Sequence, residues 1–170
     1  MNAIKYLFWT LCGLAAAAAF VWLAGVLLPA KHEASASIRI KATPEAVWAV
    51  LSAVENYPRW RSDVAVSERT NRGPDQVWTE TDARGRLTSH VQGAGRPAEK
   101  WIDRIVGGKP ERRVERVFFI VPNAQGGSQV VIKETIEIND PLGRFRARFI
   151  AGYAKDLRIL LGELKSRLAG

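Results

Sequence analysis

One carboxylate stands in an otherwise apolar row of this chain. Between residues 130 and 138 every second side chain is apolar except Glu134, while the residues in between are mostly polar. Successive side chains of a strand point to opposite faces, so this pattern places Glu134 on the buried face of a strand. A carboxylate turned into a pocket could act as a general acid or base, or bind a ligand hydroxyl. The alternative is an ion pair with Arg116, on the apolar face of the preceding strand.

Histidine and cysteine offer no further catalytic or metal-binding pattern. His32 and His90 are far apart, and the one cysteine, Cys12, lies in an apolar segment. We therefore expect no metal site. His90 alternates with Thr88 and Gln92, which predicts a solvent-exposed position. No glycine-rich phosphate loop is present, and no cofactor is expected.

Aromatic residues are the other candidates for a binding site. Tryptophan joins a large apolar surface to one N–H donor, which suits a ligand pocket as well as a packed core. Besides Glu134, the candidate ligand-binding residues are Trp48, Tyr57, Trp60, Trp78, Trp101, Phe118, Phe149 and Tyr153.

Three arginines, Arg144, Arg146 and Arg148, lie where the last helix is expected to begin. Cations are slightly unfavourable near a helix N-terminus, so Arg144 and Arg148, which share a face, are candidates for contact with anionic headgroups at a membrane surface. A solvated helix face is the alternative. The net charge of +8 fits acidic lipid or simple solubility. We expect no nucleic-acid partner.

A short helix and a set of strands should position these residues. Thr43 is a good N-cap and Pro44 suits the first helical position; we expect the helix to end at Pro58, in an aromatic corner that closes at Trp60. Alternating runs separated by turn residues predict about seven antiparallel strands. These runs begin near residues 36, 64, 77, 87, 101, 113 and 129.

Near the C-terminus the spacing of apolar residues changes from every second position to every third or fourth. Apolar residues recur every three or four positions from Leu142 to Leu168, which predicts one amphipathic helix of more than twenty residues. The order of elements is strand, short helix, antiparallel meander and long helix. Such a sheet can curl around one helix and leave a cavity between them.

The chain begins with an apolar segment. The 23 residues from Tyr6 to Leu28 carry no charge, which is long enough for a transmembrane helix. A cleaved signal peptide is the alternative, with a possible cleavage site at residues 34–36. Residues 1–32 are thus expected to form a signal anchor with a short linker, and residues 33–170 a globular domain. The basic flank at Lys5 slightly favours a single pass through the inner membrane, with the domain on the periplasmic or external side.

From residue 33 to residue 168 the chain resembles the START-like (SRPBCC) superfamily, in its polyketide cyclase/dehydrase-type branch. The resemblance rests on residues 43–48 (TPEAVW) opening the first helix, residues 57–60 (YPRW) ending that region, and the closing helix with Gly152 and Leu164. It implies an α+β helix-grip fold, in which a curved antiparallel sheet holds a long C-terminal helix over a hydrophobic pocket. It also implies an apolar ligand such as a lipid, quinone or polyketide.

Three functions fit these expectations. The first is membrane-tethered binding or transfer of a hydrophobic small molecule in an internal pocket. The second is a cyclase or dehydratase-type enzyme with Glu134 as acid or base. The third is a nonenzymatic interaction domain that uses a basic face. The sequence leaves the ligand and the oligomeric state open.

Overall fold

A computed structural model describes residues 2–71, 76–107, 113–124, 126–149 and 153–169. The chain forms two compact units. The smaller comprises residues 1–32 and 138–151, and the larger comprises residues 33–137 and 152–170. Residues 138–151, which the sequence analysis assigns to the globular domain, thus group with the N-terminal helix.

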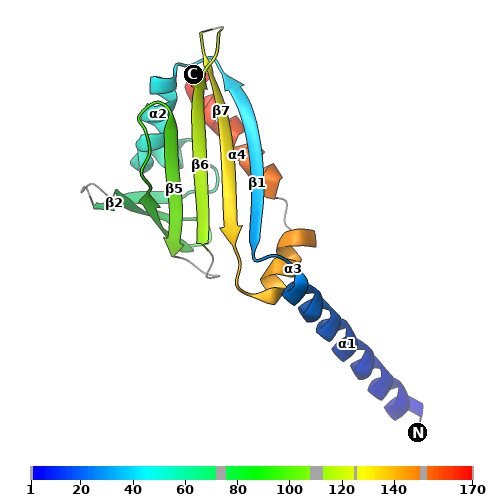
Figure 1. Ribbon diagram of the computed structural model, residues 1–170. Coiled ribbons are helices and arrows are strands. Elements are labelled where there is room, and N and C mark those ends of the chain that lie inside the picture. Colours follow the sequence, from blue (N-terminus) through cyan, green and yellow to red (C-terminus); the bar gives the residue numbers. More distant parts are fainter. Residues whose placement is uncertain (1, 72–75, 108–112, 125, 150–152, 170) are drawn as a thin grey trace. The chain divides into compact units, whose positions relative to one another are not determined.

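Within the described residues, seven strands form one antiparallel sheet with the order β1-β7-β6-β5-β4-β3-β2 (Figure 1). This confirms the predicted meander. The first strand begins at residue 31, five residues earlier than expected, so the expected linker is largely strand. The strands are β1 (Lys31–Ile40), β2 (Val66–Asn71), β3 (Val77–Thr81), β4 (Leu87–Gln92), β5 (Lys100–Gly107), β6 (Arg113–Pro122) and β7 (Ser128–Glu137).

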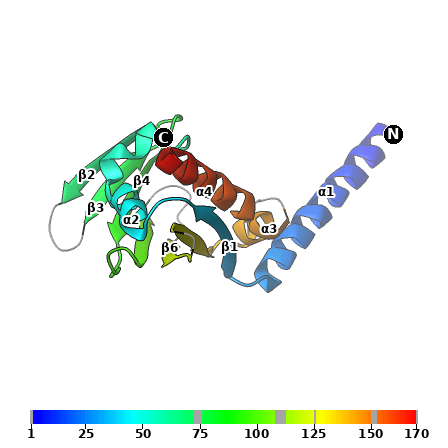
Figure 2. The same ribbon diagram turned by 90° about the horizontal axis from the view of Figure 1, so that it is seen from above.

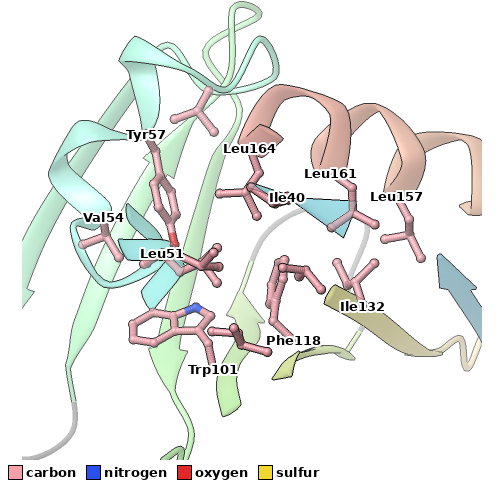
Figure 3. Close-up of a cluster of buried hydrophobic side chains, with 14 of the residues drawn as sticks. Ile40, Leu51, Val54, Tyr57, Trp101, Phe118, Ile132, Leu157, Leu161 and Leu164 are labelled. Atoms are coloured by element: carbon pink, nitrogen blue, oxygen red, sulfur yellow. Dashed lines mark hydrogen bonds between the residues drawn. The ribbon is translucent and has the colours of Figure 1, made fainter. Parts of the chain in front are cut away.

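The C-terminal helix α4 (Tyr153–Ala169) lies across the concave face of this sheet (Figure 2). Alternation along β6 and β7 directs one set of apolar side chains toward the helix, and spacing along α4 directs its leucines toward the sheet. The helix-grip fold is thus confirmed. Figure 3 shows the core between them, which includes Trp101, Phe118, Ile132, Leu157, Leu161 and Leu164, all at most 4% exposed.

The region after β1 begins as predicted and ends differently. Helix α2 (Pro44–Ser52) starts at the Thr43 cap, whose side chain accepts a hydrogen bond from the amide of Ala46. It ends well before Pro58, and a 3-10 helix, η1 (Val54–Arg59), contains that proline. The spacing of apolar residues does not distinguish one helix from two consecutive short helices that both place apolar side chains in the core.

The last helix is also two helices among the described residues, which corrects the expectation of one continuous helix. Helix α3 (Pro141–Phe149) belongs to the smaller unit and α4 to the larger. Their apolar residues share a spacing of three or four, so the pattern does not distinguish one long helix from two shorter ones. The arginines Arg146 and Arg148 therefore lie in the last turn of α3, where the helix dipole favours cations.

The smaller unit contains α1 (Asn2–Leu27) and α3. The stretch Ile4–Leu27 of α1 has 24 residues, a mean hydropathy of 2.1 and almost no burial, so it is long and apolar enough to cross a membrane. A signal sequence would have the same properties.

Candidate functional site

A cavity of about 400 Å³ lies between the concave face of the sheet and α4 in the larger unit. This volume is within the usual range of about 300 to 1,000 Å³ for small-molecule sites. One part of its wall is apolar and comes from β5, β6, β7 and α4: Ile105, Val114, Ile136, Leu157, Ile159 and Leu160. The other part is polar or charged: Ser62, Asp63, Arg86, Arg116, Glu134, Asp156 and Glu163.

Two residues of the charged wall, Glu134 and Arg116, begin a row of side chains on neighbouring strands. Glu134 of β7 is in register with Arg116 of β6, which is in register with Asp103 of β5. The Arg116 Nε donates a hydrogen bond to Glu134 Oε2, and its Nη1 lies 4.0 Å from Asp103 Oδ2. The row exists because each residue occupies an inward position in an alternating strand.

The row continues from Asp103 into the interior. Asp103 Oδ1 lies 2.8 Å from His90 Nδ1 on β4, and the other ring nitrogen of His90 lies 3.5 Å from Glu80 Oε2 on β3 and 3.1 Å from Thr88 Oγ1. The indole of Trp78 stacks on the imidazole, with ring centroids 5.1 Å apart, and its N–H donates to Glu80 Oε1 over 2.9 Å. His90, Glu80 and Asp103 are at most 4% exposed.

Arg61 connects these buried residues to the cavity wall. The buried Arg61 donates from Nη1 to Glu80 Oε1 over 3.0 Å, and from Nε and Nη2 to the two oxygens of Asp63 over 3.0 and 2.8 Å. Asp63 lines the cavity, as do Glu134 and Arg116. We call Glu134, Arg116, Asp103, His90, Glu80, Arg61 and Asp63 the charge chain; it runs through the interior of the larger unit and meets the cavity at both ends.

Burial and charged neighbours act in opposite directions on the pKa values of the charge chain. Burial alone would raise the pKa of Asp103, but the hydrogen bond and charge of His90, with Arg116 and Arg61, outweigh it and hold that pKa below its ordinary value. Burial opposes the charge of Arg61 and Arg116, yet their carboxylate partners keep the pKa of each guanidinium above its ordinary value. The pKa of Asp63 is likewise lowered, since hydrogen bonds and charge from Arg61 outweigh burial.

Tyr57 adjoins the charge chain at Arg61, whose backbone amide donates to the carbonyl of Tyr57 over 2.8 Å. Its ring lies 4.9 Å from the Arg61 guanidinium carbon, and its hydroxyl donates to the carbonyl of Leu51 over 2.7 Å. Burial, followed by the negative charge of Asp103, raises the pKa of this phenol well above its ordinary value. The hydroxyl therefore stays neutral and ties η1 to the end of α2.

Among the predicted site residues whose side chains the structure describes, Glu134 alone lines this cavity. Its partner is Arg116, as the alternative interpretation expected. Tyr57, Trp78, Trp101 and Phe118 are packed in the core, and Trp48 is half-buried beside Trp101, with centroids 5.3 Å apart. Their contact with a ligand stays a prediction.

The other predicted residues lie elsewhere. Trp60 is half-buried and lines a separate shallow groove on α4. Phe149 lies on α3, where it is 62% exposed. The side chain of Tyr153 is outside the described residues. Arg144 and Arg148 are both on α3, in the smaller unit.

The prediction for His90 was wrong, since the side chain is 1% exposed. Its neighbours in alternation, Thr88 and Gln92, are polar, which is typical of an exposed face, although each is itself half-buried. Sequence reasoning also missed Asp103, Glu80 and Arg61. Two of them carried a signal: Asp103 alternates with Trp101 and Ile105, and Glu80 with Trp78, the pattern that identified Glu134. Among the described residues, no group of His, Cys, Asp and Glu is placed to hold a metal ion.

Comparison with known proteins agrees with this architecture. Residues 31–169 match the model of the family described as polyketide cyclase/dehydrase and lipid transport. No curated protein matches the chain in sequence. Several solved structures share the fold at low sequence identity.

One is the di-domain aromatase/cyclase BexL of the BE-7585A biosynthetic pathway, with a TM-score of 0.69 and 13% identity. The match covers 83% of this chain and 51% of BexL, so this chain spans about half the length of BexL. Another is the Zhui aromatase/cyclase of Streptomyces sp. R1128, with a TM-score of 0.68, 11% identity, and coverage of 82% and 94%. A START superfamily protein of Mycobacterium smegmatis has a TM-score of 0.64, 18% identity, and coverage of 81% and 97%.

The family match covers most of the chain, from the first strand to the last helix. The seven-stranded sheet and its closing helix, observed within the described residues, are the architecture shared with the START-like neighbours. The chain therefore belongs to the polyketide cyclase/dehydrase and lipid transport family, and it shares the fold of START-like proteins.

Proposed function

We propose that this protein is a membrane-anchored domain that binds a hydrophobic small molecule carrying a polar group. The observation behind this proposal is the cavity of about 400 Å³ with an apolar wall facing a charged one. An apolar ligand body would displace water from Ile105, Val114 and Leu160. Binding of this kind gains about 25 cal/mol for each Å² of apolar surface removed from water.

The polar part of the ligand would meet Arg116 and Glu134. Arg116 offers N–H donors and Glu134 offers carboxylate acceptors, and both are already held by the charge chain. A hydroxyl or carbonyl group would be recognised by such fixed partners at little conformational cost. The family's description, and the aromatase/cyclases among the proteins of similar fold, support a lipid or polyketide-like ligand.

The anchor in this proposal is α1. Removal of α1 as a signal peptide at residues 34–36 would cut inside β1, where Ala34 and Ala36 pack against the core. Retention of α1 as a single-pass anchor preserves the whole strand. With residues 1–32 as anchor and the domain on the periplasmic or external side, the bilayer would be a direct source of apolar ligand.

Copurification tests the binding proposal. The full-length chain is purified in detergent, extracted with organic solvent and analysed by mass spectrometry. We expect a bound apolar molecule that is absent from Leu160→Trp, because the added indole fills the cavity. Lys165→Trp adds the same indole at an exposed position of α4 and should retain the ligand. A wild-type protein that carries no apolar molecule, and binds none from a panel of lipids, quinones and aromatic polyketides, would contradict the proposal.

An enzyme is the second candidate function, because the Glu134 carboxylate lies in the cavity wall. In this case Glu134→Gln should bind the copurified molecule with unchanged affinity and lose turnover, since the amide keeps a hydrogen-bond acceptor and cannot exchange a proton. Loss of stability with no change in chemistry of the bound molecule would assign the carboxylate a structural role as the partner of Arg116.

A further inference from the structure

Helix α3 exposes an amphipathic surface next to the end of α1. Its apolar residues Leu142, Phe145 and Phe149 recur at a spacing of three and four and form one stripe. Leu142 is 48% and Phe149 is 62% exposed, and the Phe145 and Phe149 rings lie 4.8 Å apart. Arg146 and Arg148 are also exposed. Large exposed aromatic and aliphatic residues on a short basic helix indicate a surface that is covered in the functional state.

Two close contacts hold α3 against α1. A Cβ atom on Gly25 would lie 2.0 Å from the carbonyl oxygen of Pro141, so only glycine permits this approach. Next to it, the amide of Ile138 donates to the carbonyl of Ala30 over 2.9 Å. The start of α3 is therefore held within a residue's width of the last turn of α1.

Arg144 reinforces this corner with its side chain. Its guanidinium donates to the carbonyls of Ile138, Leu28 and Asn139 over 2.9, 3.5 and 3.3 Å. Two of these carbonyls precede α3 and the third follows α1. Arg144 is therefore occupied by the backbone. Arg146 and Arg148 are the exposed cations of α3, and the Arg148 guanidinium carbon lies 5.6 Å from the centre of the Phe149 ring.

The length of α1 places this corner at a bilayer surface. Its apolar stretch has 24 residues, which is about 36 Å at 1.5 Å per residue, against about 30 Å for the hydrocarbon core. The excess of about one helical turn falls within the headgroup layer. Leu142 also shares an apolar hollow with the segment of α1 from Leu14 to Trp22, so the surface of α3 continues that of the anchor.

We propose that α3 lies in the headgroup layer of an anionic bilayer, with Leu142 and Phe149 in contact with acyl chains and Arg146 and Arg148 in contact with lipid phosphates. The inference rests on α1 being an anchor, as in the proposed function. An amphipathic helix at this depth gains both from buried apolar area and from attraction to acidic lipid. Because α1 would hold α3 beside the bilayer, the local concentration of α3 at the membrane surface would also be high.

A spin label at position 149 tests the proposal. The full-length chain with Cys12→Ala and Phe149→Cys is labelled and reconstituted into phosphatidylcholine vesicles with or without phosphatidylglycerol. Collision of the label with oxygen, which concentrates in lipid, is compared with collision with a water-soluble nickel chelate. In phosphatidylglycerol vesicles we expect several-fold more collision with oxygen than with nickel. The pair Arg146→Glu and Arg148→Glu should reverse this ratio, while Arg158→Glu with Arg167→Glu, the same charge change on exposed positions of α4, should leave it unchanged.

The outcomes separate the possible occupants of this surface. Equal access of nickel in both vesicle types, with the chain resistant to carbonate extraction, would overturn the proposal while leaving the anchor intact. Equal shielding in neutral and anionic vesicles would overturn the assignment of acidic headgroups. Dipolar coupling between labels at 149 would show that a second copy, and not lipid, covers the helix. Release of the chain by carbonate would contradict the anchor itself and, with it, the proposed function.

Discussion

Arg116 and Asp103 are the residues on which the charge chain depends most. Both are on inward positions of central strands, and each has a partner on either side. Removing one member of a buried ionic network leaves its partners with uncompensated charge, which costs far more than loss of an exposed ion pair. The arrangement thus gives the cavity wall fixed charges, but it also makes the stability of the fold sensitive to substitution of these residues.

Asp103→Asn should destabilise the fold by about 3 to 5 kcal/mol, because both His90 and Arg116 lose a buried carboxylate. Glu115→Gln is the matched control: Glu115 pairs with Arg104 on the solvent side of the neighbouring strand, where the two side chains are 43% and 51% exposed. It should cost less than about 1 kcal/mol. Urea unfolding of the detergent-solubilised chain measures both. Equal losses would mean that the charge chain adds nothing beyond surface pairs.

Acid should destabilise the larger unit through the same carboxylates. Folding lowers the pKa of Asp103 and Asp63 from the ordinary value of 3.8. Each carboxylate thus stabilises the fold above that pH, and the stabilisation is lost as the pH falls through the folded-state pKa. The free energy of unfolding should drop between about pH 4 and the folded-state pKa. Asp63→Asn should make this drop shallower, whereas Asp156→Asn, at an exposed position, should leave it unchanged. Urea unfolding at a series of pH values measures the drop. Identical pH dependence of the unfolding free energy for wild type and Asp63→Asn would contradict a stabilising role for the Asp63 carboxylate.

At the scale of elements, α4 stabilises the sheet by packing leucines into its concave face. Leu161→Ala should cost about 2 to 5 kcal/mol, because the residue is 1% exposed and its removal leaves a void. Ile159→Ala, on a position that is 48% exposed, should change the unfolding free energy by less than about 1 kcal/mol. Denaturant unfolding compares them. A similar small effect for both would show that α4 contributes little to the core.

The α1–α3 corner permits an equally direct test. Gly25→Ala should separate the two helices, since a Cβ atom there meets the backbone of Pro141 and the carbonyl cannot rotate away. Gly13→Ala is the control in the same helix, because nothing lies within 4 Å of its Cβ position. Hydrogen exchange of the amides in residues 141–149 should accelerate in the first variant only. Unchanged exchange in both would mean that this close approach is dispensable.

At the scale of the whole molecule, retention or cleavage of α1 decides whether the domain stays attached to a membrane. The intact mass of the chain in a membrane fraction should be 18.8 kDa, the value of the full sequence. A species shortened by more than thirty residues would show cleavage as a signal peptide, and β1 would then lose its first half. Intact mass spectrometry of the membrane and soluble fractions distinguishes these results.

Much of the architecture followed from local patterns. Period-two alternation identified the strands, and the Thr43 cap with Pro44 fixed the start of α2. The apolar N-terminal segment identified α1 by length alone. These features are local because backbone geometry ties side-chain direction to residue spacing, so a sequence by itself determines them.

The candidate site was decided by tertiary structure. Glu134 was found because its neighbours in one strand are apolar, whereas His90 alternates with polar residues and was assigned to solvent. Its burial depends on Asp103 and Glu80, which come from different strands, and on the stacked Trp78. Likewise, α3 and α4 continue one apolar spacing in the sequence but belong to different units of the fold. The sequence thus determined the family, the sheet and the apolar N-terminal helix. Only folding brought together charges that are distant along the chain, because each buried charge requires partners that no local pattern supplies.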